Sequence, residues 1–459
     1  MTFKQIALKI IRANAKKYML QICSNSFAIA VFYTYMTLLT SRKFVRVLNE
    51  HGCDDSFIYA PCIVTIVFSI LFIIFSYSTF IKARKPEFGN YLVLGMTSRN
   101  IKTLIIVESL IMSAISICIG LGTGMILSKL TSLLVKRILD ISYVPIEFTL
   151  LSYEYTIGFF GAIFIIATAV SLFSIGKYEI VKLIKGTRYS DRNLLGKLWV
   201  GFIGVILTEL SILHSKVYSK FFTEDQDTFP VFISIIICCI GIYIVISNTA
   251  WFSELILMPF QKKRIRGLMF VSDIRYSFGK VKNIVFVVML LSAATNFFCN
   301  ICVYLITDFE RITTGYNPYH IAYAEFPGIN QLTEEKHFQL FLFSFVGVLF
   351  FITSCLLLHF ALAIDKDIEK AKFKKLYKMG ITKKEAGKII SNKLLLLFIL
   401  PIVLAIFITV KYCSILFNMT GAGDTFFVGT TLIGSIYLLF QIVFFIVYRR
   451  FYINSVLKL

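Results

Sequence analysis

Ionisable residues inside apolar stretches are where this sequence could do chemistry. Glu209, in the segment LTELSILH, is expected to lie deepest in an apolar span. A charge at membrane depth costs at least about 2.5 kcal/mol, so it marks a functional site unless the carboxylate turns into a helix bundle and is hydrogen-bonded. Glu108 lies nearer the end of its span, where water is closer. Because neighbouring spans offer Glu209 no clear charged partner, ion-coupled secondary transport is only an alternative.

Motifs of soluble enzymes give no better candidate. The sequence contains no G-x-x-x-x-G-K-[ST] phosphate loop, no HExxH and no Cys/His cluster with zinc spacing. Cys299 and Cys302 form a CxxC, but they lie in an apolar segment without a second pair, which favours packing over metal or redox chemistry. We therefore expect a protein that is not an enzyme and that binds no metal or cofactor itself.

The composition indicates the elements that must position these residues. Hydrophobic residues make up 57% of the chain and charged residues only 16%, whereas soluble domains have roughly half and a quarter. Many stretches are apolar for the roughly twenty residues needed to cross a bilayer. We predict an all-α polytopic membrane protein, with the first span retained rather than cleaved. The ten predicted spans are 18–40, 57–81, 104–128, 152–176, 198–215, 230–257, 283–307, 338–364, 394–417 and 426–448.

The net charge of +21 is explained by topology. If the N-terminus is cytoplasmic, most Lys and Arg fall in the inside segments, which is the bias that orients membrane helices. Both termini are then expected in the cytoplasm. The basic residues also favour contact with the lipid bilayer, and nucleic acid is not an expected partner.

A short sequence motif occurs twice in the chain. Residues 94–110 read LGMTSRNIKTLIIVESL, and residues 379–395 read MGITKKEAGKIISNKLL. A shift of 285 positions pairs Gly95 with Gly380 and Thr97 with Thr382, and it pairs Glu108 with Lys393 as an asymmetry. Each glycine ends a helical stripe and suits a helix C-cap, and each threonine suits the start of the next helix. The other matched pairs are Phe88 with Phe373, Arg99 with Lys384, Ile105 with Ile390 and Leu110 with Leu395.

The repeat predicts the domain organisation. Two related four-helix units, spans 1–4 and 7–10, are joined by an extra helix pair, spans 5–6, as internal duplication in transport proteins would produce. Gly120, Gly122 and Gly124 are expected to serve close helix packing. The predicted segments are an interfacial amphipathic helix at 1–17, a first unit at 18–190, a linking pair at 191–282, and a second unit at 283–459 with a short extracellular loop at 308–337.

The segment KARKPEFGNYLVLGMTSRNIKTLIIVESLI resembles the core of FtsX-like permeases. The whole chain looks most similar to the ten-span Bce-type permeases of ABC transporters for bacitracin and other antimicrobial peptides, with their large extracellular domain missing. FKQIALKIIRANAKKYML and FSFVGVLFFITSCLLLHFALAIDKDIEKAKFKKLYKMGITKKEAGKIISNKLLLLFILPIVLAI resemble further parts of that family. The resemblance implies a permease subunit in a bacterial cytoplasmic membrane. It would work with two copies of a separate ATPase that binds ATP and Mg²⁺.

By this resemblance, the two matching loops are ATPase-coupling segments. A short helix with an apolar stripe could seat in a groove of the ATPase, while basic residues such as Arg84 stay near headgroups or an acidic partner surface. The implied coupling residues are Arg84, Lys85, Phe88, Tyr91, Leu92, Gly95, Thr97 and Arg99 in the first segment, and Lys370, Phe373, Leu376, Tyr377, Gly380, Thr382 and Lys384 in the second.

Two functions are consistent with this resemblance. The leading hypothesis is a transporter acting on a peptide antibiotic or its lipid complex. The alternative is a regulatory FtsX-like scaffold that transmits force or signal to a sensor histidine kinase or a cell-wall hydrolase without transport. The missing extracellular domain weakens the case for peptide capture but leaves ATPase coupling unaffected.

Overall fold

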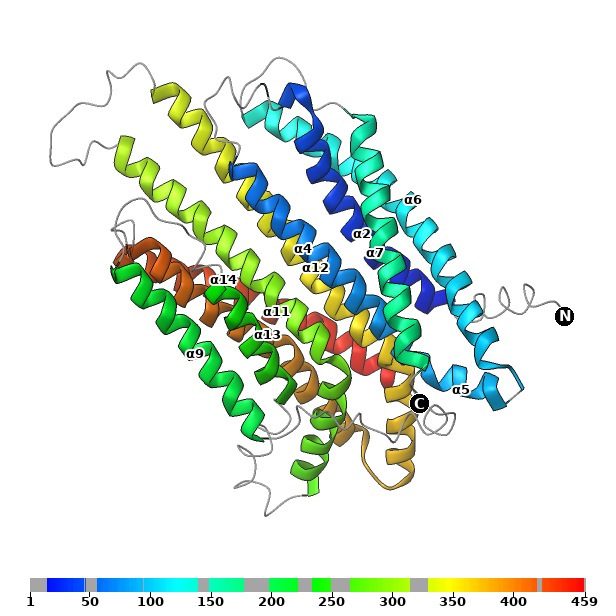
Figure 1. The fold of residues 1–459 in the computed structure, drawn as a ribbon. Helices are drawn as coiled ribbons and strands as arrows, with labels where there is room; N and C mark the ends of the chain where they lie inside the picture. Colours follow the sequence, from blue (N-terminus) through cyan, green and yellow to red (C-terminus); the bar gives the residue numbers. More distant parts are fainter. Residues whose placement is uncertain are drawn as a thin grey trace. The chain divides into compact units, whose positions relative to one another are not determined.

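The computed structural model describes residues 15–44, 46, 56–93, 95–138, 148–176, 198–221, 233–248, 265–313, 329–418 and 423–457, and these are almost entirely α-helical (Figure 1). One further helix spans Ile233–Asn248. The labelled helices are α2 (Ala15–Thr40), α4 (Ser56–Ala83), α5 (Lys85–Val93), α6 (Ser98–Ile138), α7 (Leu150–Gly176), α9 (Leu198–Phe221), α11 (Ile265–Thr313), α12 (Ile329–Lys378), α13 (Lys383–Asn418) and α14 (Gly423–Val456).

Within the described residues, 9 helices are long and apolar enough to cross a membrane. They correspond to nine of the predicted spans and confirm a multi-pass, all-helical membrane protein. The remaining prediction, 230–257, is described only as the shorter helix Ile233–Asn248. The nine spans are Tyr18–Thr40, Cys62–Ile81, Ser98–Arg137, Leu150–Phe173, Trp199–Tyr218, Lys282–Ile306, Gln339–Phe360, Lys383–Ile415 and Thr430–Val456.

Helix ends differ from the sequence prediction outside the apolar cores. The predicted extracellular loop at 308–337 lies between the spans Lys282–Ile306 and Gln339–Phe360, and it includes helical turns, because α11 continues to Thr313 and α12 begins at Ile329. Helical backbone can extend beyond the hydrocarbon, so hydropathy alone misses these polar turns. The predicted interfacial helix at 1–17 lies largely outside the described residues, which begin at residue 15.

The chain divides into two compact units, residues 1–186 with 301–363, and residues 187–300 with 364–459. Helices α11 and α12 therefore contribute to both. The predicted arrangement of two repeat units with a linking pair remains a prediction.

Helix α2 is the central helix of the first unit and packs against α4, α6 and α7. Its closest approach is to α6, where glycines remove the side chains that would keep the backbones apart. A Cβ atom on Gly120 would lie 2.6 Å from Cβ of Ile29, and one on Gly124 would lie 2.9 Å from the Tyr33 ring. These contacts confirm the packing role for Gly120 and Gly124, whereas a Cβ on Gly122 would meet nothing within 4 Å.

Replacing Gly120 with alanine should lower the melting temperature of the detergent-solubilised protein by several degrees, because the added methyl cannot fit beside Ile29. The matched control is Gly122→Ala on the same helix. A Cβ there meets nothing within 4 Å, and alanine is the better helix former, so stability should hold or rise slightly. Equal melting temperatures for the two variants would contradict the packing role.

In the second unit, α13 packs against α14 and α9. The Tyr412 hydroxyl of α13 donates a hydrogen bond to the Ser234 carbonyl at 3.0 Å. The Ser292 and Tyr437 hydroxyls, on α11 and α14, lie 2.8 Å apart. Hydrogen bonds of this kind between helices add to association in a membrane.

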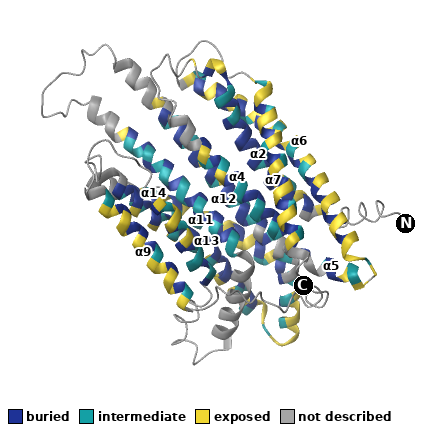
Figure 2. Cartoon of the chain, in the orientation of Figure 1, coloured by how far each residue is buried: buried dark blue, intermediate teal, exposed yellow. Residues whose placement is uncertain are grey.

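Large apolar side chains are exposed along the outer helices of each unit (Figure 2). Ile126 on α6 is 65% exposed, Ile165 on α7 is 69% exposed, and Leu439 on α14 is 61% exposed. Exposed apolar surface on this scale is expected where lipid, not water, is the solvent.

Candidate functional site

The two matching loops have the same backbone geometry. Gly95 and Gly380 have φ of 92° and 95°. The Gly95 amide donates to the Leu92 carbonyl at 3.1 Å, and the Met96 amide to the Tyr91 carbonyl at 3.0 Å. The Gly380 loop repeats both bonds at equivalent residues, so each preceding helix ends in a Schellman motif. The predicted glycine caps are confirmed.

The predicted threonine caps are confirmed as well. Thr97 Oγ1 accepts a hydrogen bond from the Asn100 amide at 3.3 Å and starts α6. Thr382 Oγ1 accepts one from the Glu385 amide at 3.3 Å. The Glu385 carboxylate accepts in return from the Thr382 amide at 3.2 Å, which completes a capping box at the start of α13.

The helices leading into the two turns differ because of a single residue. Pro86 has no amide hydrogen to continue the α4 ladder, so α4 ends at Ala83 and α5 starts again at Lys85. Figure 1 shows α5 at the end of its unit where α6 begins. The equivalent position in the second loop is Ala371, and α12 continues without a break to Lys378. We call residues 84–99 and 370–385 the first and second coupling segments.

Arg84 occupies the junction between α4 and α5 and is completely buried. Its Nη1 lies 2.5 Å from Glu108 Oε2, and its Nη2 lies 3.3 Å from Glu108 Oε1, so the pair is bidentate with α6. Its Nε donates to Glu87 of α5 at 3.0 Å. The guanidinium carbon also lies 5.2 Å from the ring centre of Tyr18 of α2, 5.6 Å from Phe80 and 5.1 Å from Phe88.

This burial corrects the expectation that Arg84 stays near headgroups or a partner surface. Burial alone would lower the pKa of Arg84, but the hydrogen bond and charge of Glu108 outweigh it and raise the pKa above its usual value. The residue is therefore a charged core residue that joins α2, α4, α5 and α6. The sequence could not reveal this, because a basic residue beside an apolar span ordinarily indicates topology.

A second buried ion pair lies beside the second coupling segment. Lys393 Nζ of α13 donates to Glu369 Oε1 of α12 at 2.6 Å, and both side chains are 7% exposed. Glu108 and Lys393, which the sequence repeat pairs although their charges are opposite, are therefore each part of a buried ion pair. Glu369 was missed by sequence reasoning, although the shift of 285 positions that pairs Glu108 with Lys393 also pairs Arg84 with Glu369.

The apolar stripes are divided between the protein core and the surface. Phe88 and Phe373 are buried within the chain and cannot enter a groove of another subunit. Tyr91 and Leu92 are half-buried, as are Leu376 and Lys370. The stripe thus anchors each coupling helix to its own membrane helices, because periodicity identifies an apolar face but not what covers it.

The exposed apolar residues lie at the tips of the coupling segments. Val93 is 68% exposed, Tyr377 51% and Met379 71%. Val93 and Met379 were not among the predicted site residues. Basic and polar residues are exposed at the tips as well. Lys85 lies in α5, and its side chain is not among those that the structure describes. The exposed predicted residues are Gly95, Thr97, Arg99, Tyr377, Gly380, Thr382 and Lys384.

Glu209 lies near the middle of α9 with an exposed side chain. The alternative in which this carboxylate turns into a helix bundle is therefore not what the structure shows. Within the described residues, the His, Cys, Asp and Glu side chains form no group of three that could hold a metal ion. Cys302 is buried, and its thiol points to the Leu340 carbonyl at 3.7 Å, which fits a packing residue.

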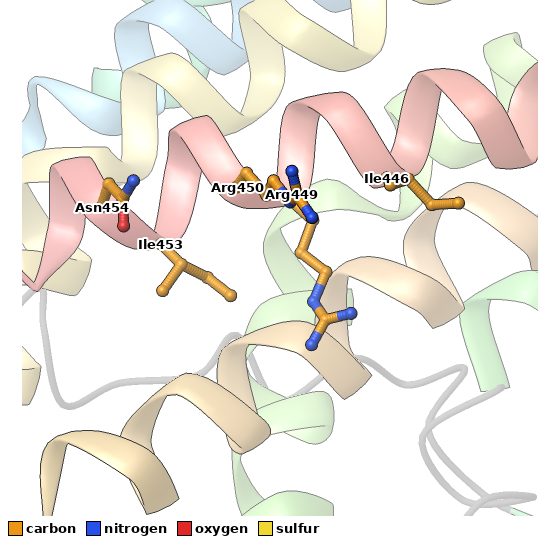
Figure 3. Close-up of a pocket in the computed structure, with 5 residues that line it drawn as sticks. All are labelled: Ile446, Arg449, Arg450, Ile453 and Asn454. Carbon is orange, nitrogen blue, oxygen red and sulfur yellow. The ribbon is translucent and has the colours of Figure 1, made fainter.

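A shallow hollow lies on one face of α14 near its C-terminal end, lined by Ile446, Arg449, Arg450, Ile453 and Asn454. Figure 3 shows Arg449 and Ile453 projecting from the same side of the helix. A Cβ on Gly387 of α13 would lie 3.9 Å from Ile453. The last turns of α14 thus pack against the first turns of α13 and add two exposed arginines near the second coupling segment.

The comparisons with known proteins agree with this membrane architecture. Residues 62–180 match the family model described as FtsX-like permease C-terminal. This range contains the first coupling segment, Arg84 and Glu108. The chain therefore contains an FtsX-like permease region and is a distant homologue of Bce-type ABC transporter permeases.

Three similar curated proteins come from Bacillus subtilis (strain 168). The uncharacterized ABC transporter permease YvcS is 31% identical over 253 residues, 53% of this chain and 37% of YvcS. The ABC transporter permease protein YxdM is 24% identical over 295 residues, 64% of this chain and 46% of YxdM. The bacitracin export permease protein BceB is 23% identical over 215 residues, 45% of this chain and 33% of BceB. The matched regions thus span less than half the length of each relative.

Proposed function

We propose that this chain is the non-catalytic permease subunit of an ABC transporter and that its two coupling segments each dock one copy of a separate ATPase. The observation that carries the proposal is the pair of turns with the same Schellman geometry, each presenting exposed apolar residues at the entrance to a membrane helix. The relatives' descriptions as ABC transporter permeases support the same role.

The position of the termini supports a cytoplasmic orientation for the coupling segments. Tyr18, near the start of α2, contacts Arg84, so the first turn lies at the N-terminal end of α2. Gly387 lies beside Ile453 and Leu457, so the second turn lies at the C-terminal end of α14. With both termini in the cytoplasm, as the distribution of basic residues favours, both turns face the compartment that supplies ATP.

ATP and Mg²⁺ would be bound by the partner ATPase. Closure of two ATPase copies would move the coupling segments, and the buried ion pairs would pass that movement to α6 and α13. For the substrate, we propose a peptide antibiotic or its lipid complex, on the basis of the similarity to a bacitracin export permease. We propose a sensor histidine kinase as a further partner of the same complex.

Native mass spectrometry of the protein co-expressed with its ATPase tests the docking role. We expect a mass increment of two ATPase copies. Replacing both Val93 and Met379 with aspartate should abolish it, because a charge would lie where apolar surface must be buried. The melting temperature should not change, because both side chains are exposed.

The matched control is Arg137→Asp, an exposed site at the other end of α6, and it should retain both copies. Failure of the unmodified protein to bind any ATPase would refute the docking role. If the ATPase binds but a deletion strain keeps its susceptibility to every cell-wall peptide, the regulatory scaffold replaces the transporter.

A further inference from the structure

The two buried ion pairs occupy equivalent positions with opposite polarity. Arg84 and Glu108 are 24 residues apart, as are Glu369 and Lys393. The shift that superposes the two coupling segments superposes these pairs as well. In the first pair the base precedes the acid, and in the second the acid precedes the base.

Both pairs are so deeply buried that the stability of the protein depends on each charge keeping its partner. Arg84 and Glu108 are 0% and 1% exposed as side chains, and the second pair is 7% exposed at each residue. A buried charge that loses its partner destabilises a protein strongly, whereas a satisfied pair is close to neutral. Each of these residues therefore needs an opposite charge at the matching position of the helix against which it packs.

The duplicated sequence creates a specific folding error. The two coupling segments share their phenylalanine, glycine and threonine positions, and related segments of one chain are prone to exchange during folding. If α4 and α5 packed on α13, Arg84 would meet Lys393. If α12 packed on α6, Glu369 would meet Glu108. Both exchanged arrangements bury like charges, which costs several kcal/mol.

We infer that the opposite polarity of the two ion pairs restricts each coupling segment to the membrane helix that follows it in sequence. The pairs act as positioning residues that select the correct partner helix. Two pairs of the same polarity would hold the native structure equally well but would also satisfy the exchanged one. This role does not depend on what binds to the coupling segments.

The test reverses the second pair, because the aromatic rings of Tyr18, Phe80 and Phe88 around Arg84 would not accept a carboxylate. Glu369→Lys and Lys393→Glu are made singly and together in the full chain. Melting temperature reports the native pair, and the fraction of monodisperse monomer after extraction reports partner choice during folding. The matched control is Glu369→Asp with Lys393→Arg, which changes the same positions and keeps the polarity.

Each single reversal should shift the folding equilibrium by at least about a hundredfold, because it buries two like charges. The reversed double should recover the melting temperature of the control. It should still yield at least about twofold less monomer, because the exchanged pairing is now charge-matched.

Two results would overturn the inference. The first is a monomer fraction equal to that of the polarity-preserving control, which would leave polarity without effect on folding. The second is a single reversal no less stable than the reversed double, which would mean that Glu369 and Lys393 are not coupled.

Discussion

Replacing Arg84 with alanine should lower the free energy of unfolding by about 3–5 kcal/mol, because Glu108 is left as a buried carboxylate without its bidentate partner. The same change removes a cation from between Tyr18, Phe80 and Phe88 and separates α5 from α6. The folded fraction of this variant should also lose stimulation of the bound ATPase. Unfolding in a detergent–SDS titration measures the first effect, and phosphate release by the assembled complex measures the second.

A double-mutant cycle separates the ion pair from a general effect of truncation. Arg84→Met combined with Glu108→Leu should be less destabilised than Arg84→Met alone, because no unpaired charge remains. Arg99→Ala, an exposed position in the same coupling segment, should change stability by no more than about 0.5 kcal/mol. Additive effects of the two core substitutions would exclude a coupled pair.

Replacing both Gly95 and Gly380 with proline should remove the two ATPase copies from the complex. Proline fixes φ near −65°, whereas these residues have φ of 92° and 95°. It also lacks the amide that Gly95 donates to the Leu92 carbonyl and that Gly380 donates to the Tyr377 carbonyl. Forming each turn with proline would cost about 3 kcal/mol. We therefore expect ATPase affinity to fall by more than about a hundredfold, as measured by native mass spectrometry or biolayer interferometry.

A graded series at the same two positions isolates backbone conformation from side-chain size. A Cβ at either glycine meets nothing within 4 Å, so φ discriminates between asparagine and alanine, and proline additionally removes the amide donor. Asparagine tolerates the left-handed region and should retain both ATPase copies, and alanine should fall between asparagine and proline. Loss of binding in the asparagine variant would point to the absence of a side chain, and not to the turn, as the requirement.

The sequence predicts most of the local structure at the coupling segments. Gly95 and Gly380 end their helices and Thr97 and Thr382 begin the next ones, because caps depend on a few neighbouring residues. Pro86 could likewise have indicated that α4 and α5 are separate helices. The nine long apolar helices of the described residues follow from hydropathy alone.

What the sequence does not reveal depends on contacts between helices. Arg84 and Arg99 are the same residue type in the same segment, yet one is buried against Glu108 and the other is exposed. Phe88 appears in the sequence as part of a docking surface because its periodicity does not say whether the chain's own helices or a partner covers it. The depth of Glu209 in its span does not say which way the carboxylate faces, because depth along α9 does not fix rotation about its axis.

The break at Pro86 gives the two coupling segments different mechanical properties. A force on the second segment passes into α12 through the continuous main-chain hydrogen bonds before Lys378. In the first segment the helix is interrupted at Arg84, where backbone hydrogen bonds to Ile81 and from Phe88 are supplemented by side-chain contacts with Glu87, Glu108 and the aromatic rings. The second segment therefore continues a single unbroken helix, whereas the first is separated from α4 by a break at Arg84. If each segment docks one ATPase copy as proposed, we expect a substitution of Arg84 to weaken transmission through the first coupling segment and to leave the second unaffected.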